Sequence, residues 1–224
     1  MHELTEDPES ILRVEWDIPG KPYPAKVVTL ASGEKLVIRE ASREEVPLLL
    51  DAIRPVIPVE KDFYDLVGSR LYAELLGWYR YRVKNHFALV GVLNGELVGI
   101  VNNRARNLKE HISLHTMAFR RGGRIGAHLF AAKHEHSIEV LGADKIFVTV
   151  EGPIGLRRWI YEWALEPWPL EHEANGGARN WVLTKEHYSE VKPRLVFGER
   201  PVPEDLLKST LKPKVIVPDV VKQK

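Results

Sequence analysis

Two apolar segments separated by Asn94-Gly95 constrain the fold more than any other part of this sequence. HFALVGVL precedes this dipeptide and ELVGIVNNRA follows it. Both residues of an Asn-Gly pair accept the positive φ angles that a tight type I′ turn requires. The sequence therefore predicts an antiparallel hairpin in the middle of the chain, and the rest of the fold has to be built around these two strands.

Further strands and helices are predicted on both sides of this hairpin. The β-branched segments AKVVTLA and KLVIREA, separated by SGE, indicate an earlier hairpin, and HISLHTMAF alternates as a strand does. A helix over 43–53 should begin at Ser42, with Glu45 as its capping-box partner. Apolar residues at spacings of three and four predict another helix over 61–83. The second half should contain a helix over 126–141, the strand KIFVTVE, a helix in PIGLRRWIYEWALE and two strands in PLEHEA and RNWVLTKEHY.

This element order predicts an α/β protein of the mixed α+β kind, with strands outnumbering helices around one mixed sheet. We divide the chain into an N-terminal arm (1–24), a folded domain (25–190) and an extended C-terminal tail (191–224). The arm contains the proline-rich stretch IPGKPYP, which cannot continue a helix or a central strand. The tail contains five prolines and a lysine-rich end.

Charge and cysteine content exclude several kinds of site. The 32 basic and 31 acidic residues leave a net charge of +1, so we expect neither a nucleic acid nor a membrane as partner. Because there is no cysteine, disulfides, thiolate metal sites and a cysteine nucleophile are excluded. The first residues do not read as a secretory signal, and no apolar stretch approaches the ~18 residues of a spanning helix. We therefore expect a cytoplasmic protein.

The histidines do not predict a metal site. On a helix, His128, His134 and His136 point about 120° and 80° away from one another, which favours a solvated helix face. His111 and His115 share one face of a strand but lie too far apart to chelate a metal unaided. We expect no bound metal.

The stretch RRGGRIGAHLF, which follows the strand HISLHTMAF, is the clearest candidate for a ligand site. Glycines at the start of a helix let backbone amides approach an anion, and the helix N-terminus adds about half a positive charge. Arg120, Arg121 and Arg124 can add charge-assisted hydrogen bonds. Phosphate is the ligand that this pattern favours, and a plain surface turn is the alternative.

These residues resemble the GNAT superfamily, the acyl-CoA-dependent N-acetyltransferases. Arg121-Gly122-Gly123-Arg124-Ile125-Gly126 matches the first and last positions of the family signature, and Arg124 stands where the family usually has glycine. Ile160-Tyr161 falls where family members often carry a tyrosine in a helix, although Ile154 replaces the usual asparagine near the start of that helix. The resemblance covers roughly residues 35–188 and implies a central mixed, mostly antiparallel, twisted sheet flanked by helices.

The resemblance implies an enzyme that moves an acetyl or similar acyl group from acyl-CoA to an amine of a small molecule or a protein. Acetyl-CoA would be the donor. The strand before the loop would hydrogen-bond the pantetheine arm, and the loop would hold the pyrophosphate. The residues implied in coenzyme binding are Met117, Ala118, Phe119, Arg121, Gly122, Gly123, Arg124, Ile125, Gly126 and Ala127.

Acyl transfer needs an acid for the leaving thiolate and a base for the amine. By resemblance Tyr161 is the candidate acid, and a core aromatic residue is the alternative. The candidate bases are His115, with an ordinary pKa near ~6.5, and Glu151, and a chain of waters could replace both. The aromatic residues of the helix over 61–83 favour an apolar or aromatic acceptor, although core packing explains them as well.

Two other classes of function stay open. Arg124 and the missing asparagine fit a non-catalytic, GNAT-like acyl-CoA-binding or regulatory module. A nucleotide-binding protein is the poorer alternative, because the loop lacks the Lys-Ser or Lys-Thr ending of a P-loop. The expected partners are acyl-CoA and an amine acceptor, and a homodimer is an option because the tail could reach a neighbouring subunit.

Overall fold

The computed structural model describes residues 20–80, 82–150, 152–169 and 179–223. Its strands are β1 (Lys26–Thr29), β2 (Lys35–Glu40), β3 (His86–Leu93), β4 (Glu96–Ala105), β5 (Glu110–Ala118), β6 (Lys145–Thr149), β7 (Glu166–Trp168), β8 (Asn180–Thr184) and β9 (Lys214–Val215). Its α-helices are α2 (Val46–Ile53), α3 (Tyr64–Tyr79), α4 (Ile125–Glu135), α5 (Pro153–Gly155), α6 (Lys185–Leu195) and α7 (Glu204–Lys208). There are 3-10 turns at Arg43–Glu45, Arg54–Val56, Lys61–Phe63 and Val221–Gln223, and π-helical turns at His136–Val140 and Leu156–Tyr161.

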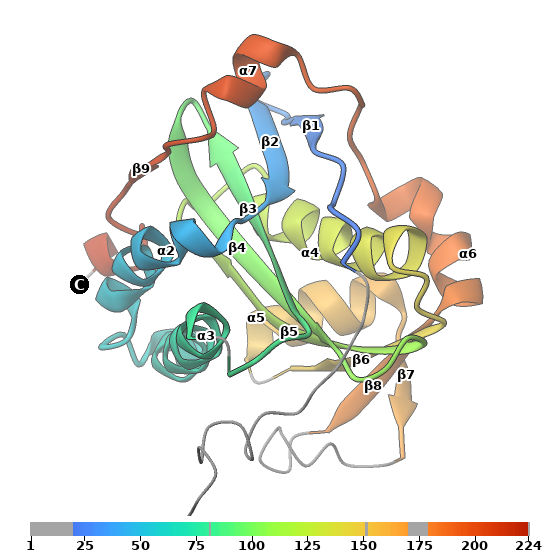
Figure 1. Cartoon of the computed structure of the whole chain (residues 1–224). Helices are drawn as coiled ribbons and strands as arrows, with labels where there is room; N and C mark the ends of the chain where they lie inside the picture. The colour runs from blue at the N-terminus through green and yellow to red at the C-terminus, as the bar shows by residue number, and fades with distance from the viewer. Residues whose placement is uncertain (1–19, 81, 151, 170–178, 224) are drawn as a thin grey trace, which may run out of the picture.

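The strands form one nine-stranded sheet in the order β1-β2-β3-β4-β5-β6-β8-β7, with β9 paired to β4 (Figure 1). The pairs β5–β6 and β4–β9 are parallel. All other neighbouring strands of the sheet are antiparallel. The sheet is therefore mixed, mostly antiparallel and flanked by helices, which confirms the predicted fold class.

The central hairpin is present as predicted. β3 and β4 pair antiparallel, and the turn residues Asn94 and Gly95 have φ angles of 52° and 75°. Every residue of β3 is buried, and so are most residues of β4. Strands that are covered on both faces need continuous apolar runs rather than alternation, which explains why both segments are so uniformly apolar.

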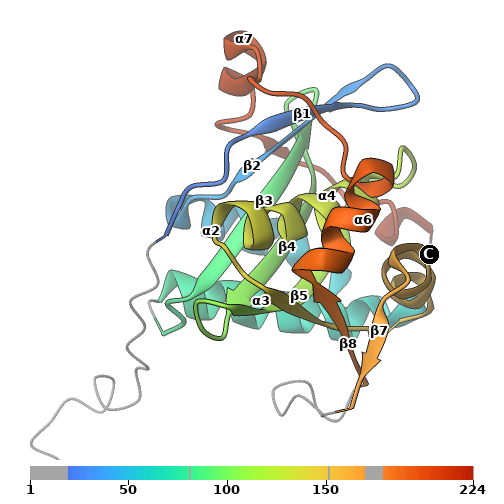
Figure 2. The ribbon, with the colours of Figure 1, turned by 90° about the vertical axis from the view of Figure 1, so that its right-hand side faces the viewer.

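Helices cover both faces of the sheet (Figures 1 and 2). α2 and α3 lie on one face, where Leu49 and Leu71 belong to one buried cluster with Val90 of β3. α4 lies on the opposite face and buries Leu129 against β2, β3 and β4. A third cluster, which includes Trp163, joins α4 to β6, β8 and α6. None of the helices in the described ranges combines the length and the apolar character needed to cross a membrane.

Most predicted helices are confirmed, and their ends differ in detail. The segment 43–53 is helical, and Ser42 and Glu45 form the predicted capping box. The helix predicted over 61–83 already ends at Tyr79. The residues KEHY were assigned to the last strand, and this is wrong: Thr184 ends β8 and caps α6 by accepting a hydrogen bond from the His187 amide. Of PLEHEA, all but Pro169 lies outside the described residues.

The C-terminal segment packs along the domain. The predicted boundary between residues 190 and 191 falls inside α6. Further on, Val27 and Glu199 exchange backbone hydrogen bonds of 2.8 and 3.1 Å, and Arg39 binds the Thr210 carbonyl at 2.6 Å. Val220 is only 5% exposed and belongs to the core under α2. The tail is thus folded over the sheet rather than extended into solvent, while the three-part division of the chain stays a prediction.

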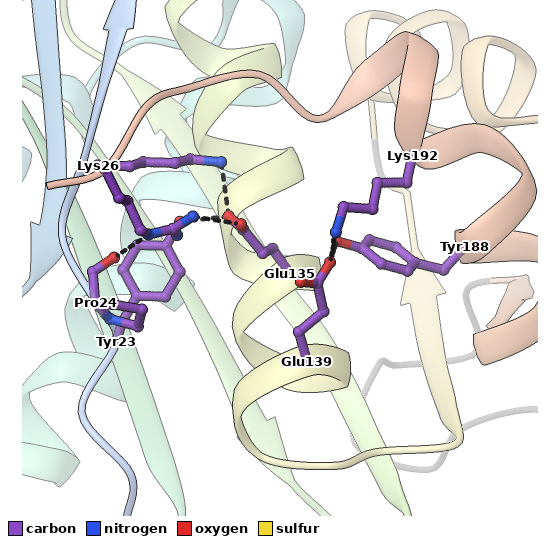
Figure 3. A network of polar contacts seen from close by, with 8 residues as sticks. Tyr23, Pro24, Lys26, Glu135, Glu139, Tyr188 and Lys192 are labelled. Carbon is purple, nitrogen blue, oxygen red and sulfur yellow. Dashed lines mark hydrogen bonds and ion pairs between the residues drawn. The ribbon is translucent and has the colours of Figure 1, made fainter.

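One carboxylate on α4 joins the segment before β1 and β1 itself to the segment that follows α6 (Figure 3). Glu135 accepts hydrogen bonds of 2.6 Å from the Tyr23 hydroxyl and 2.6 Å from the Lys26 ammonium, and one of 2.9 Å from the Arg200 guanidinium. Burial alone would raise the pKa of Glu135, but the bonds from Arg200 and Lys26 outweigh it and hold the pKa at about 2. Glu139, one turn further along, joins α6 through a tyrosine hydroxyl and a lysine.

Buried histidines should make the stability of this fold depend on pH. His111 on β5 is fully buried, and neither ring nitrogen has a hydrogen-bond partner among the described residues. Burial lowers its pKa to about 4. The unfolded chain keeps a value near ~6.5 and takes up the proton first, so the stabilisation is complete above about pH 6.5 and is lost as pH falls toward 4.

We expect His111→Gln to flatten this dependence. Between pH 6.5 and the folded-state pKa, one buried imidazole changes the free energy of unfolding by roughly 1.4 kcal/mol per pH unit. Urea unfolding at several pH values measures that slope. His187→Gln, at a partly exposed position on α6, is the control and should keep the slope of the parent protein. An equal slope in parent and His111→Gln would contradict the prediction.

Candidate functional site

The parallel strands β5 and β6 pair along only part of their length. Residues 110–113 pair with 145–148, after which β5 continues toward Ala118 without a β6 partner. The cause is a β-bulge: between the pairs Asn103–Ser113 and Val101–Thr116, β5 has one residue more than β4. Leu114 and His115 therefore lie opposite Asn102 alone. A bulge bends its strand and interrupts pairing, and here it leaves a gap in the middle of the sheet.

Side chains satisfy the backbone groups that the bulge leaves unpaired. The side-chain oxygen of Asn102 accepts a hydrogen bond of 2.8 Å from the His115 amide. The Lys133 ammonium nitrogen lies 3.1 Å from the backbone carbonyl oxygen of His115 and 3.4 Å from the backbone carbonyl oxygen of Asn102. Lys133 is 1% exposed, and burial lowers its pKa well below the usual range. Lys133 was missed in the sequence because a lysine on an amphipathic helix normally lies at the surface.

A cavity of about 110 Å³ occupies the gap. The hydroxyls of Ser113 and Thr116 face no hydrogen-bond partner in the described part of the chain, although both are buried. Such groups are costly unless a ligand or water satisfies them. The wall residues come from β5, α3, α4, the end of β6 and the helical segment after it: Asp62, Tyr64, Val67, residues 113–116, Phe130, Thr149, Val150, Gly152, Ile154, Gly155 and Trp159.

The glycine-arginine loop connects β5 to α4 beside this cavity. Gly122 and Gly123 have φ angles of +93° and +56°, and Arg124 follows with φ 56° and ψ 27°. Arg124 thus adopts the left-handed conformation that glycine takes most easily, at a cost of roughly 1 kcal/mol. This explains why glycine is the usual residue at that position of the signature. The loop lies next to the cavity at Gly126, because a Cβ atom at this position would be 3.7 Å from Trp159, one of the residues that line the cavity.

The loop presents a row of unused amides. The N–H groups of Gly122, Gly123, Arg124, Gly126 and Ala127 have no acceptor within the described ranges. The Ile125 amide makes only a long bond of 3.4 Å to the Gly122 carbonyl. Free amides at the start of an eleven-residue helix are able to bind an anion.

The three arginines contribute less than the sequence suggested. Arg120 is paired with Glu34 through two hydrogen bonds of 3.1 Å, and Arg124 is paired with Glu162. The Arg121 amide donates to the Asp219 carboxylate at 2.8 Å. The backbone amide of the first signature residue, Arg121, is therefore already hydrogen-bonded to the C-terminal segment. The Arg121 side chain is exposed and has no ion-pair partner among the residues described.

Of the three predicted catalytic residues, the structure describes His115 and Tyr161, and only His115 lines the cavity. His115 lines the cavity, but burial, with the charges of Lys133 and Arg70, lowers its pKa to about 3, so the ordinary value expected from sequence is wrong. Tyr161 is 70% exposed and does not line the cavity. Glu151 lies outside the described residues. The roles of all three stay predictions.

Two of the residues predicted to bind the coenzyme arm, Met117 and Phe119, lie at the end of β5 and just before the loop. Met117 and Phe119 are buried, and the Phe119 amide and carbonyl are already bonded to Val98 and Asp219. Only β5 positions nearer the bulge, such as Thr116, reach the cavity.

The histidines of α4 and the turn after it are packing residues. The prediction of a solvated helix face is wrong, because His134 and His136 are fully buried. The His134 ring lies 4.1 Å from the Phe130 ring, and the His136 ring lies 5.4 Å from that of Tyr23. Burial lowers the pKa of both imidazoles. In the part of the chain that the structure describes, no three acidic or histidine side chains are grouped to hold a metal ion.

Comparison with known proteins identifies the fold. No family model and no curated protein sequence matches the chain. Among solved structures, the ligand-free form of FdhC, a nucleotide-linked sugar GNAT, is similar with a TM-score of 0.53 at 9% identity, over 80% of this chain and all (100%) of that one. The GNAT domain of S. lividans PAT gives 0.53 at 11% identity, over 74% and 99% of the two chains. A Bacillus halodurans protein gives 0.52 at 12% identity, over 76% and 95%.

This chain has the GNAT fold, as the loop signature implied. At such low identities the similarity extends to the fold alone. The activity has to be argued from the loop, the gap and the cavity of this protein.

The unused amides predict that the loop binds a diphosphate. A side chain at Gly122 would meet no atom within 4 Å, so Gly122→Ala disturbs no packing, but alanine rarely adopts the φ of +93° found there, and the backbone that carries the loop amides would have to shift. We expect the affinity for inorganic pyrophosphate, measured by calorimetry, to fall about tenfold. Gly142→Ala is the matched control, since Gly142 also has a positive φ (+80°) and open space. Equal affinities in the two variants would refute the prediction.

Proposed function

We propose that this protein is an enzyme, a GNAT-type acyltransferase that moves an acetyl or similar acyl group from acyl-CoA to an amine of a small molecule or a protein. The observation that carries the proposal is the row of unused amides between Gly122 and Ala127. It lies at the start of the helix that also lines the hydroxyl-bearing cavity. An acyl-CoA carries a diphosphate and, at the end of a long arm, a thioester. The free amides could bind the diphosphate, and the neighbouring cavity could take up the thioester.

The reaction sets requirements that the site can be tested against. The amine nitrogen attacks the thioester carbonyl carbon, the new C–N bond forms, and the C–S bond breaks with its electron pair passing to sulfur. One proton leaves the nitrogen and one proton reaches the sulfur, so the products are an amide and a free thiol. The hydroxyls of Ser113 and Thr116 are available donors for the carbonyl oxygen of the acyl group.

The proposed reaction needs one group that protonates the sulfur and one that takes up the amine proton. Tyr161 would protonate the thiolate, which rests on the resemblance alone. His115 lies at the cavity but, with a pKa of about 3, is a weak proton acceptor at neutral pH. This favours Glu151 or a chain of waters as the route for the amine proton.

A non-catalytic, acyl-CoA-binding module is the second candidate function. It is favoured by the exposure of Tyr161 and by the Asp219 carboxylate on the Arg121 amide. A regulatory role would keep coenzyme binding and lack transfer.

Calorimetry with acetyl-CoA, followed by a thiol-release assay with a panel of amines, tests both candidates. Binding together with amine-dependent thiol release supports the acyltransferase. Binding without release supports the binding module. If folded protein gives no heat with acetyl-CoA at millimolar concentration, both are wrong.

Tyr161→Phe separates chemistry from binding. If Tyr161 is the acid, removing its hydroxyl should lower kcat at least about a hundredfold, because general acid catalysis typically contributes that much. The dissociation constant of acetyl-CoA should not change. Tyr79→Phe, a partly exposed tyrosine at the end of α3, is the matched control and should leave kcat unchanged. An active Tyr161→Phe enzyme would remove Tyr161 from the mechanism.

A further inference from the structure

A second cavity, of about 260 Å³, lies between α3 and the strands β4 and β5. It shares two wall residues with the first cavity, and these are Leu114 and His115, the pair that forms the bulge. The bulge is therefore the common wall of both spaces. A volume below the roughly 300–1,000 Å³ of drug-sized pockets suits a small ligand.

The second cavity contains charges of both signs. Its wall residues include Glu74 and Arg70 from α3 and Arg104 from β4. Among the residues that the structure describes, the wall of the first cavity has one charged side chain, that of Asp62. A small ligand in the second cavity would therefore meet an acceptor for a cation and donors for an anion within one space.

The Glu74 carboxylate is not neutralised by its nearest basic neighbour. One of its oxygens is buried without a hydrogen-bond partner among the described residues and lies 3.8 Å from the His86 ring nitrogen. Burial lowers the pKa of His86 to about 3, so this ring is uncharged at neutral pH. Burial also raises the pKa of Glu74, while the positive charge of Arg104 opposes that rise. A ligand ammonium is the partner that this carboxylate lacks.

Arg104 lies opposite His86 in the β3–β4 ladder and opposite Ile112 in the β4–β5 ladder. Arg104 is half-buried, and no carboxylate in the described ranges lies within ion-pair distance of its guanidinium. The planar guanidinium suits two parallel hydrogen bonds to a carboxylate. Glu74 and Arg104 thus offer one site for an ammonium and one for a carboxylate, in a cavity that ends at His115.

We propose that the second cavity binds the acyl acceptor, and that this acceptor is a small amino acid, a molecule that carries both an amine and a carboxylate. Arg104 binds the carboxylate, Glu74 attracts the ammonium form, and the nitrogen lies toward Leu114 and His115, the residues that line both cavities, where it would meet the acyl group. The inference rests on the proposed acyltransferase function and names its substrate class. It departs from the apolar or aromatic acceptor expected from the sequence, because only Tyr64 among the rings of α3 lines either cavity.

The test compares amino acids with their carboxamides as acceptors for acetyl-CoA, using the full-length protein. The carboxamide keeps the amine and replaces the carboxylate by a neutral group of similar size. We expect kcat/KM to be at least about tenfold higher for the best amino acid than for its carboxamide, as expected for charge-assisted hydrogen bonds. The amine of a carboxamide has a lower pKa than that of the amino acid, so more of it is neutral and reactive. This difference favours the carboxamide and therefore cannot explain a preference for the amino acid.

Variants of single residues test which side chain causes the preference for amino acids over their carboxamides. Arg104→Gln should bring the ratio of the two kcat/KM values close to one, while the dissociation constant of acetyl-CoA stays unchanged. Arg106→Gln, two residues further along the chain and exposed outside the cavity, is the matched control and should keep the ratio. Glu74→Gln should weaken amino acid and carboxamide alike. If Arg104→Gln does not fold, Arg104→Lys, which keeps the charge and loses the planar fork, should show a reduced ratio.

Three results would overturn the inference. One is equal turnover of amino acids and carboxamides by the parent protein, and another is an Arg104→Gln ratio equal to that of the parent. The third is the absence of transfer to any amino acid by protein that binds acetyl-CoA. If acetyl-CoA does not bind at all, the proposed function fails separately, and calorimetry with the amino acids alone then decides: heat that Arg104→Gln abolishes supports the cavity, and no heat refutes it.

Discussion

One extra residue in β5 produces the bulge that lies between the two cavities and next to the end of the β5–β6 pairing. Because Leu114 and His115 together oppose Asn102, the strand bends away from β6, and the parallel pairing ends after Ser113. A sheet without this bulge would bond the two strands along their length and close the gap. The cost of the irregularity is met by Asn102 and the buried Lys133, which satisfy the backbone groups released there. Both cavities are consequences of the same insertion.

The anion loop and the bulge act at opposite ends of one short stretch of β5. In the proposed function, the loop amides would hold the diphosphate, and the bulge would limit how far the arm of the acyl-CoA can enter the sheet. Gly99 supports the arrangement from β4, since a side chain there would meet the Met117 carbonyl oxygen at 2.8 Å. The close approach of β4 and β5 is therefore maintained next to the loop and relaxed only at the bulge.

Local patterns in the sequence predict the local features well. Asn94-Gly95 has one favourable turn type, Ser42 and Glu45 form a box of fixed spacing, and the glycine-arginine signature begins a helix as expected. The missed features depend on tertiary contacts. A lysine or histidine on an amphipathic helix looks solvent-exposed until aromatic rings and carbonyl groups from distant segments surround it. The bulge leaves almost no trace in HISLHTMAF, because one additional residue changes the alternation only slightly, and Glu74 becomes informative only once Arg104 is placed beside it.

The Glu135 cluster imposes an order on folding. Its bonds to Tyr23, Lys26 and Arg200 span 112, 109 and 65 residues of sequence, whereas the β3–β4 hairpin closes across a two-residue turn. Closing long loops is entropically costly and slow, so local pairing comes first. During synthesis on the ribosome, the hairpin, which ends at Ala105, can form before the second half of the chain is complete, whereas Glu135 can bind its last cation only after Arg200 has emerged. In the folded protein one of the three side chains that bond Glu135 comes from the C-terminal segment, so this cluster can be completed only when that segment is present.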